Sequence, residues 1–158
     1  MDSGVLQPGE GRTVWVVGDR YTIKTSGEDT GGAFALIEAL VPPGGGPPPH
    51  IHRREDEAFY LLEGELLFHV DGRDIAAGAG TWVTLAKGSL HHFKNIGDRP
   101  ARMLIVVTPA GLERYFLEVG RAADQGDGET VAPTPEDIEK LVAVAPHYGI
   151  EIQPPEAA

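Results

Sequence analysis

The sequence contains no cysteine among its 158 residues. A metal site in this chain must therefore use nitrogen and oxygen ligands, and a thiolate nucleophile is excluded. Basic residues are also scarce, because 13 Lys and Arg stand against 24 Asp and Glu, which gives a net charge of −11. Such a charge repels nucleic-acid phosphates and anionic lipid headgroups, so we expect neither partner and take the charge to favour solubility.

Long hydrophobic runs are missing as well. No apolar stretch approaches the roughly 20 residues that are needed to cross a bilayer. The first residues, Met1 to Gly4, lack the basic and then apolar pattern of an export signal, which predicts a cytoplasmic protein without membrane contact. A chain of this length can bury a hydrophobic core without disulfides, so we expect a single domain.

Short runs of β-branched and aromatic residues, separated by turn residues, are typical of an all-β sandwich or barrel. Strands are predicted at 12–17, 20–25, 34–41, 56–62, 65–70, 73–77, 81–85, 90–95 and 101–108. Tight hairpin connections are expected at Gly18-Asp19, Glu63-Gly64 and Asp71-Gly72, and the last of these is the strongest turn signal. The pattern predicts an antiparallel core.

The pattern changes after residue 110. Residues 111–120 carry apolar side chains at helical spacing, and a loop rich in Gly and Asp follows at 124–129. Thr134 and Pro135 suit the start of a second helix, whose end the sequence leaves open at Pro146. The single domain is thus expected to comprise N-terminal strands (1–30), a barrel (31–109) and a C-terminal helical extension (110–158).

Candidate metal ligands follow the Pro- and Gly-rich segment 42–49. His50 and His52 are two residues apart, so both imidazoles face the same side of an extended strand. Glu57 follows on the next strand, where it shares a face with Phe59, and His91 opens a later strand. Three neutral imidazoles and one carboxylate suit Fe, Mn, Ni, Co or Zn and would leave coordination positions open for a substrate.

These two clusters resemble the paired motifs of the cupins, and specifically those of single-domain cupins of the quercetin 2,3-dioxygenase-like group. The first motif is met by Gly44, His50, His52, Glu57 and Gly64, and the second by Gly80, Gly88, His91 and Asn95. Ala86 stands where the family has Pro. The resemblance implies a cupin-type double-stranded β-helix (jelly-roll barrel) with one divalent transition metal ion held by His50, His52, Glu57 and His91.

The resemblance also implies a function. A dioxygenase of this group would act on a small organic enol or phenol such as a flavonol, with the substrate oxyanion at the metal and Glu57 as the catalytic base. Cupins host many reactions, so a metal-dependent isomerase or lyase that uses no O2, and a non-catalytic small-molecule-binding cupin, are alternatives. A homodimer is expected, because resembled cupins are commonly dimers and the N-terminal strands would leave open edges.

The remaining aromatic and histidine residues have simpler interpretations. Phe59, Phe93 and Trp82 are candidates for the wall of a substrate pocket, although small barrels fill their interiors with such residues in any case. His92 directly follows His91 and should face outward. His69 and His147 are expected to be surface or structural histidines.

Charged residues surround the first motif. Alternation along a strand turns Asp56 away from Glu57, which argues against a site with several carboxylates. Arg53 and Arg54 are expected to offset the acidic charge at the rim of the barrel.

Overall fold

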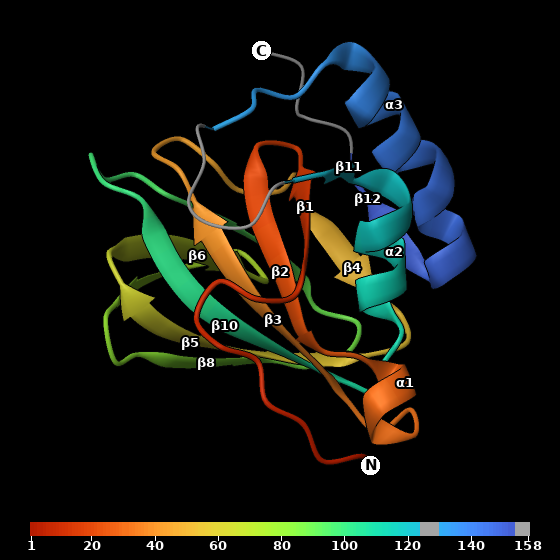
Figure 1. Cartoon of the computed structure of the whole chain (residues 1–158). Coiled ribbons are helices and arrows are strands. Elements are labelled where there is room, and N and C mark those ends of the chain that lie inside the picture. The colour runs from red at the N-terminus through yellow and green to blue at the C-terminus, as the bar shows by residue number, and fades with distance from the viewer. Residues whose placement is uncertain (124–129, 154–158) are drawn as a thin grey trace.

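A computed structural model describes residues 1–123 and 130–153 of the chain (Figure 1). Its strands are β1 (Arg12–Val16), β2 (Asp19–Thr25), β3 (Ala35–Val41), β4 (His50–His52), β5 (Asp56–Glu63), β6 (Glu65–Val70), β7 (Arg73–Gly78), β8 (Trp82–Leu85), β9 (Leu90–Lys94), β10 (Ala101–Thr108), β11 (Arg121–Ala122) and β12 (Ile150–Ile152). The helices are α1 (Gly27–Thr30), α2 (Leu112–Val119) and α3 (Pro135–Val144), and the 3₁₀ turn η1 (Ala145–Tyr148) follows α3 directly. All the predicted strands are present, with ends that differ by at most one residue.

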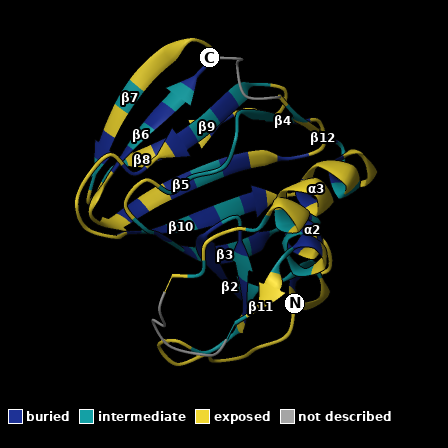
Figure 2. Ribbon diagram, turned by 90° about the horizontal axis from the view of Figure 1, so that it is seen from above, coloured by how far each residue is buried: buried dark blue, intermediate teal, exposed yellow. Residues whose placement is uncertain are grey.

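Two antiparallel sheets enclose the core. Within the described ranges, the first sheet has the strand order β11-β1-β2-β3-β10-β5-β8, and the second has the order β12-β4-β9-β6-β7. Figure 2 shows buried residues along the strands of both sheets, with α2 and α3 gathered at one end. The prediction of an all-β jelly-roll barrel with short C-terminal helices is confirmed.

Alternation of side chains along β5 explains how the core reaches the ligand cluster. Glu57, Phe59 and Leu61 are buried, whereas the intervening Tyr60 and Leu62 are exposed. Successive side chains of a strand point to opposite faces, so the inward face of β5 presents one carboxylate and then two apolar groups. Glu57 is the buried acid of β5 and is therefore held among hydrophobic neighbours.

Of the predicted hairpin connections, the one at 71–72 is confirmed and the one between β1 and β2 lies one residue earlier than predicted. Asp71 and Gly72 connect β6 to β7, and both have positive φ angles, of 47° and 80°. That hairpin is confirmed. The turn between β1 and β2 is Val17-Gly18, one residue earlier than predicted, because Asp19 already pairs with Val16.

The hairpin prediction at Glu63-Gly64 is wrong. The strand before it, β5, pairs with β10 and β8, whereas the strand after it, β6, pairs with β7 and β9. Gly64, with a φ angle of 77°, therefore carries the chain from one sheet to the other. A Cβ atom at Gly64 would lie 2.9 Å from the carbonyl oxygen of Pro100, so this crossing has no room for a side chain.

The C-terminal helices begin as the sequence predicts. The Thr134 side chain accepts a hydrogen bond from the backbone N–H of Asp137 (3.2 Å), and the Asp137 carboxylate accepts one from the Thr134 N–H (2.8 Å). This reciprocal pair caps α3. The end that the sequence left open falls at Val144, and Pro146 lies in the 3₁₀ turn. The predicted loop at 124–129 is outside the described residues.

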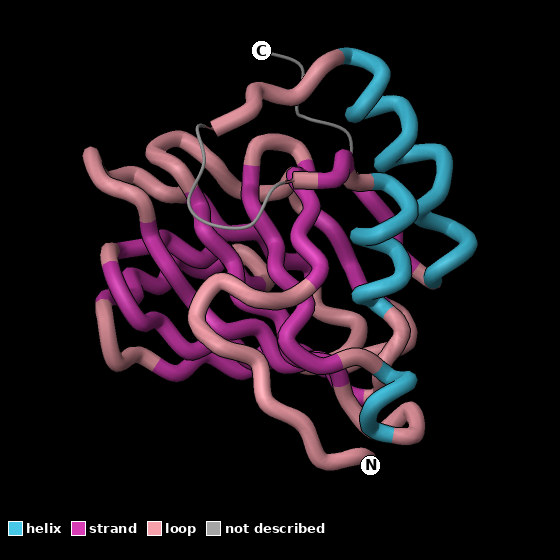
Figure 3. The backbone as a smooth tube through the Cα atoms, viewed as in Figure 1, coloured by secondary structure: helices cyan, strands magenta, loops and turns pink. Residues whose placement is uncertain are grey.

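The shortest strands have no counterpart among the predicted ones. Figure 3 shows the helices on one side of the strand framework, and β11 and β12 connect that side to the sheets. Because β11 pairs with β1 at Val14 and Trp15, the N-terminal strands do not leave the open edge on which a homodimer was expected. The homodimer stays a prediction.

Among the described helices, none is both long and apolar enough to cross a membrane.

Candidate metal centre

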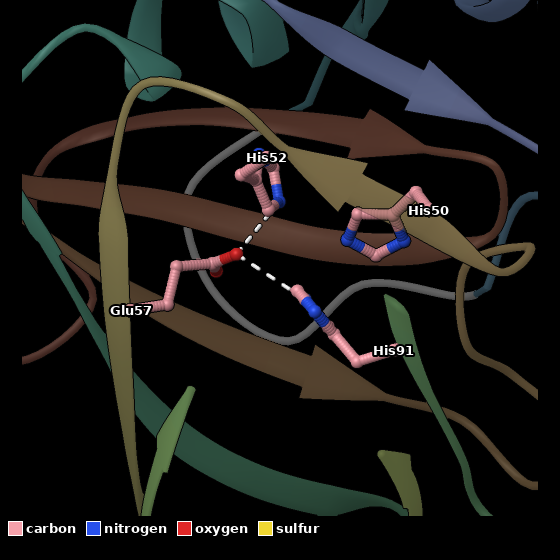
Figure 4. Close-up of side chains that lie close together, drawn as sticks. All are labelled: His50, His52, Glu57 and His91. Atoms are coloured by element: carbon pink, nitrogen blue, oxygen red, sulfur yellow. Dashed lines mark ion pairs between the residues drawn. The ribbon is translucent and has the colours of Figure 1, made fainter. Parts of the chain in front are cut away.

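The side chains of the four predicted ligands point toward one another (Figure 4). One potential ligand atom from each of His50, His52, Glu57 and His91 lies within 4.8 Å of the others. Strand β4 supplies His50 and His52, β5 supplies Glu57, and β9 supplies His91, which pairs directly with His50 across the sheet. Glu57 reaches the cluster from the opposite sheet. The site therefore forms only where both sheets meet.

Electrostatic contacts inside the cluster are close. Oε1 of Glu57 lies 2.6 Å from Nε2 of His52 and 3.4 Å from Nε2 of His91. Burial alone would raise the pKa of Glu57, but the charge of His52 and the nearby His52 and His91 nitrogens hold that pKa well below its usual range. Burial acts to lower the pKa of His52, yet the carboxylates of Glu57 and Glu55 keep it above its ordinary value.

His50 behaves differently from His52. Burial, together with the electrostatic effect of the neighbouring His52 and His91, lowers the pKa of His50 to about 3. Its imidazole is therefore neutral at pH 7, and a neutral imidazole has the lone pair that a metal ligand requires.

The second nitrogen of each ring has an acceptor beside it. Nδ1 of His50 lies 2.9 Å from the carbonyl oxygen of Pro48, and Nδ1 of His91 lies 3.2 Å from that of Ser89. A proton on Nδ1 would satisfy these carbonyls and leave Nε2 free to bind an ion. The geometry thus favours one tautomer in both residues.

Glu55 places an acceptor beside the outer nitrogen of His52. The sequence analysis did not identify this residue. Its Oε1 atom lies 3.3 Å from Nδ1 of His52, and both side chains are about 5% exposed. Carboxylates that hold the outer nitrogen of a ligand histidine orient the ring and make it more basic. The signal in the sequence was an acid three residues after His52, at the start of the acidic run Glu55-Asp56-Glu57, of which only the last two residues were considered above.

The donor set fits a transition metal ion. Nδ1 of His52 and Oε1 of Glu55 are close enough for an ion pair, at 3.3 Å, but do not form a well-aligned hydrogen bond. Oε1 of Glu57 and Nε2 of His91 are also buried without a well-formed hydrogen bond, and both are potential ligand atoms. Burying such atoms without a partner costs free energy, and an ion bound between them would remove that cost. Three imidazoles and one carboxylate suit Fe, Mn, Ni, Co or Zn.

Asn95 holds the ligand strands together through bonds to Gly44, Gly45 and Val41. The N–H of Gly44 donates to the carbonyl oxygen of Asn95 (2.8 Å), and the N–H of Asn95 donates to that of Gly45 (3.0 Å). The buried Asn95 side chain also donates to the carbonyl oxygen of Val41 (3.0 Å). These bonds fix the start of the Pro-rich segment against the end of β9. Asn95 is therefore structural.

A cavity of about 50 Å³ adjoins the four ligands. Phe59 and Phe93 belong to its wall, as the sequence analysis expected. Their rings lie 6.1 Å apart between centroids, in an edge-to-face arrangement. Further wall residues come from outside the two motifs: Val16, Tyr21, Tyr115, Phe116, Leu141, Ile150 and Ile152.

The prediction that Trp82 lines this pocket is wrong. Trp82 is 55% exposed and contacts Tyr60 on the outer face of the first sheet, with ring centroids 6.4 Å apart. Its neighbour Val83 points inward and pairs with Phe59. A shift of one residue along a strand exchanges the two faces, which accounts for the error.

The other histidines lie away from the cluster, as expected. His92 stacks on His69 across two neighbouring strands, with ring centroids 4.3 Å apart and an interplanar angle of 20°. His69 also pairs with Asp74. His147 is exposed in η1.

Arg53 and Arg54 were expected to offset the acidic charge at the rim of the barrel, and the structure gives them partners in the C-terminal segment. The Arg53 guanidinium donates to both oxygens of Glu151 at 2.9 and 3.0 Å. Arg54 donates to the carbonyl oxygen of His147 at 3.1 Å. Both arginines therefore bind the C-terminal segment. Asp56 is exposed and points away from Glu57, as predicted.

Residues 37–107 match the model of the family described as "Cupin domain". Quercetin 2,3-dioxygenase of Bacillus subtilis is 26% identical over 116 residues, which are 73% of this chain and 34% of that protein. For three curated relatives, the matched segment covers between 34% and 55% of the relative's own length.

Solved structures give the same grouping. A predicted oxalate decarboxylase from Thermotoga maritima has a TM-score of 0.61 and 25% identity, and the match covers 67% of this chain and 99% of that one. A sugar phosphate isomerase of the cupin superfamily from Silicibacter pomeroyi has a TM-score of 0.52 and 26% identity, over 59% of this chain and 60% of the other.

Proposed function

This chain is a cupin, and on that basis we propose that it is a metal-dependent dioxygenase that acts on a small organic enol or phenol, flavonols being one candidate class. The observation that carries the proposal is the convergence of His50, His52, Glu57 and His91 beside a cavity. The similarity to a quercetin 2,3-dioxygenase supports the choice of reaction class.

The metal ligands and the apolar wall of the cavity would have different roles in this reaction. When bound, a divalent transition metal would acidify a substrate hydroxyl and provide redox chemistry with O2. The three imidazoles and the carboxylate would hold that ion. Apolar walls that include Phe59 and Phe93 keep water away from an electron-rich substrate, which limits side reactions.

Glu57 is proposed as the base as well as a ligand. Its position beside the cavity supports this role, whereas the lowered pKa of the carboxylate keeps it ionised but weakens it as a base. An ionised acid in this position could accept the proton of a substrate hydroxyl. The Glu57→Gln variant should retain metal at reduced affinity and lose turnover by roughly 100- to 10,000-fold. Full turnover in a metal-loaded Glu57→Gln protein would remove the base role.

Elemental analysis combined with oxygen consumption tests the reaction class. The purified protein should contain about one transition metal ion per chain and should take up O2 with an enol or phenol from a panel of flavonols, diketones and phenols. His91→Gln should lose the metal, whereas the matched control His92→Gln should keep it, because His92 faces outward. A sample that binds no transition metal would refute the proposal.

A metal-dependent isomerase is the second candidate. The similarity to a sugar phosphate isomerase, at 26% identity, favours it over other reactions without O2. An isomerase would convert its substrate without oxygen consumption, so the oxygen electrode separates the two reactions. A protein that binds panel compounds and converts none of them would instead be a binding module.

A further inference from the structure

The first sheet has apolar side chains on both of its faces. An antiparallel sheet with one face toward water normally carries polar residues at every second position of its strands. Residues 58–62 of β5 instead read AFYLL, and residues 103–107 of β10 read MLIVV. Such continuous apolar runs are typical of strands that are covered on both faces. The sequence of these strands therefore indicates that the outer face of the sheet also has a partner.

The outward side chains of neighbouring strands form one contiguous patch. The inward positions of β5 and β10 are buried, and the positions between them face outward because side chains alternate. Tyr60 pairs with Trp82 on one side and with Leu104 on the other, and Val106 pairs with Ala58. We call the following residues the outer patch: Ala58, Tyr60, Leu62, Trp82, Leu104 and Val106.

Three residues of the outer patch expose large apolar side chains. Trp82 is 55% exposed, Tyr60 is 40% exposed and Leu62 is 38% exposed. The rings of Tyr60 and Trp82 lie 6.4 Å apart between centroids, so the two aromatic groups adjoin. Trp and Tyr are prominent among the residues that supply most of the binding energy of protein interfaces. A contiguous exposed patch with such residues marks an interaction surface.

The distribution of charge indicates what binds there. The chain has a net charge of −11, so two copies repel each other unless their facing surfaces lack acids. The outer patch contains no charged residue, and beside it Arg102 donates to Glu38 at 2.7 Å, which forms a neutral pair. Asp56 and Glu63 stand at the two ends of β5. Two copies that meet through the outer patch would therefore keep these acids at the periphery of the contact.

The composition of the outer patch also suits a permanent partner. Interfaces of obligate homodimers resemble a hydrophobic core cut in half, whereas those of transient partners are more polar. A two-fold axis places the same surface of both copies in contact, so apolar side chains meet apolar side chains. A standard interface buries about 800 Å² on each partner. The outer patch would form its apolar centre, and polar neighbours such as Thr84 would belong to its rim.

We propose that two copies of this chain form a two-fold homodimer through the outer patch, with Tyr60 and Trp82 as the central anchors. Because β11 covers the edge of β1, the contact uses a sheet face rather than the edge of the N-terminal strands. Strand β5 turns Glu57 inward and Tyr60 outward, so the metal ligands lie on the opposite side of the sheet from the contact. The proposal is therefore independent of the proposed function.

Sedimentation equilibrium at micromolar concentration tests this surface. The wild type should be a dimer, and Trp82→Glu should weaken dimerisation by at least about 100-fold, because it places a charge at the centre of an apolar contact. Val142→Glu is the matched control, since it adds the same charge at a side chain that is 49% exposed on α3, and it should remain dimeric. A monomeric wild type, or a Trp82→Glu protein as dimeric as the wild type, would overturn the proposal.

Folding of the variants is checked separately. Trp82 is exposed in the single chain, so Trp82→Glu should keep the circular dichroism and the metal content of the wild type. Tyr60→Glu, at the neighbouring anchor, provides a second variant if Trp82→Glu does not fold. It should weaken dimerisation in the same way, and a folded Tyr60→Glu protein that dimerises like the wild type would refute the outer patch.

Cross-linking locates the contact directly. The chain contains no cysteine, so Leu62→Cys introduces a single thiol into the outer patch and Val142→Cys introduces one on α3. A bismaleimide should give a covalent dimer of Leu62→Cys and leave Val142→Cys as a single chain on a denaturing gel. The reverse result would place the contact at the C-terminal helix and would overturn the proposal.

Discussion

Oε1 of Glu55 lies 3.3 Å from Nδ1 of His52, on a ring whose other nitrogen is 2.6 Å from Glu57. One imidazole is thus held between two buried carboxylates. Removal of the outer carboxylate charge should weaken the orientation and basicity of His52. We expect Glu55→Gln to lower metal affinity by roughly 10- to 100-fold, as measured by competition with a chelator of known affinity.

Asp56→Asn is the matched control for Glu55→Gln. It removes the same charge one residue further along, at an exposed side chain, and an asparagine keeps the oxygen that accepts from the backbone N–H of Lys87 (2.7 Å). Metal affinity should be unchanged in this variant. Equal losses in both variants would mean that general charge, rather than contact with His52, governs affinity.

Gly46 should be far less tolerant of substitution than Gly44. A Cβ atom at Gly46 would collide with the backbone carbonyl of Phe93, whereas one at Gly44 meets nothing within 4 Å. Both glycines have positive φ angles, of 135° and 78°. We expect Gly44→Ala to cost about 1 kcal/mol from backbone strain alone, and Gly46→Ala to cost about 3 kcal/mol because overpacking is added. Urea unfolding measures both, and equal costs would contradict the collision.

Asp19 should make the stability of the protein depend on pH. Burial raises its pKa from the ordinary 3.8 to about 7, although the hydrogen bond from Tyr21 acts to lower it. Between these two pH values the folded protein holds a proton that the unfolded chain releases. The stability that this proton contributes is present below about pH 4 and is lost as the pH rises through about 7.

The Asp19→Asn variant isolates this contribution. An asparagine does not titrate, so the stability of the wild type relative to the variant should fall between pH 4.5 and pH 7.5. Urea unfolding of the metal-free proteins at both pH values measures the difference and keeps metal binding out of the comparison. A difference that is constant, or that grows with pH in favour of the wild type, would contradict the assignment.

The expected homodimer can be checked by light scattering at micromolar concentration. A mass of twice the chain is predicted. Since β11 covers the edge of β1, a dimer would have to use another surface. A monomer would show that the expectation drawn from resembled cupins does not hold for this chain.

Spacing made the ligand cluster predictable. His50 and His52 share a strand face because strand geometry repeats every two residues, and Glu57 follows in phase on β5. The same periodicity failed for Trp82, because no ligand in β8 indicates which of its faces is buried. Glu55 was missed for a related reason, since it lies between β4 and β5, where alternation does not apply.

Periodicity could not predict that Leu141, Ile150 and Ile152 form part of the cavity wall. Strand β12 has only three residues, too few for a pattern, and it pairs with β4, which lies far earlier in the chain. Helix α3 was predictable from its own cap and its apolar positions, but nothing local indicates that Leu141 borders the cavity. Contacts between segments distant in sequence determine the cavity, and a single sequence does not contain them.

The pairing of β12 with β4 also orders events during synthesis. The strand that carries His50 and His52 leaves the ribosome early, yet its hydrogen-bonding partner at 150–152 follows almost a hundred residues later. Until that partner arrives, one edge of the ligand strand is open and Ile150 and Ile152 are missing from the wall. Enclosure of the ligand cluster can therefore be completed only after residues 150–152 have been made.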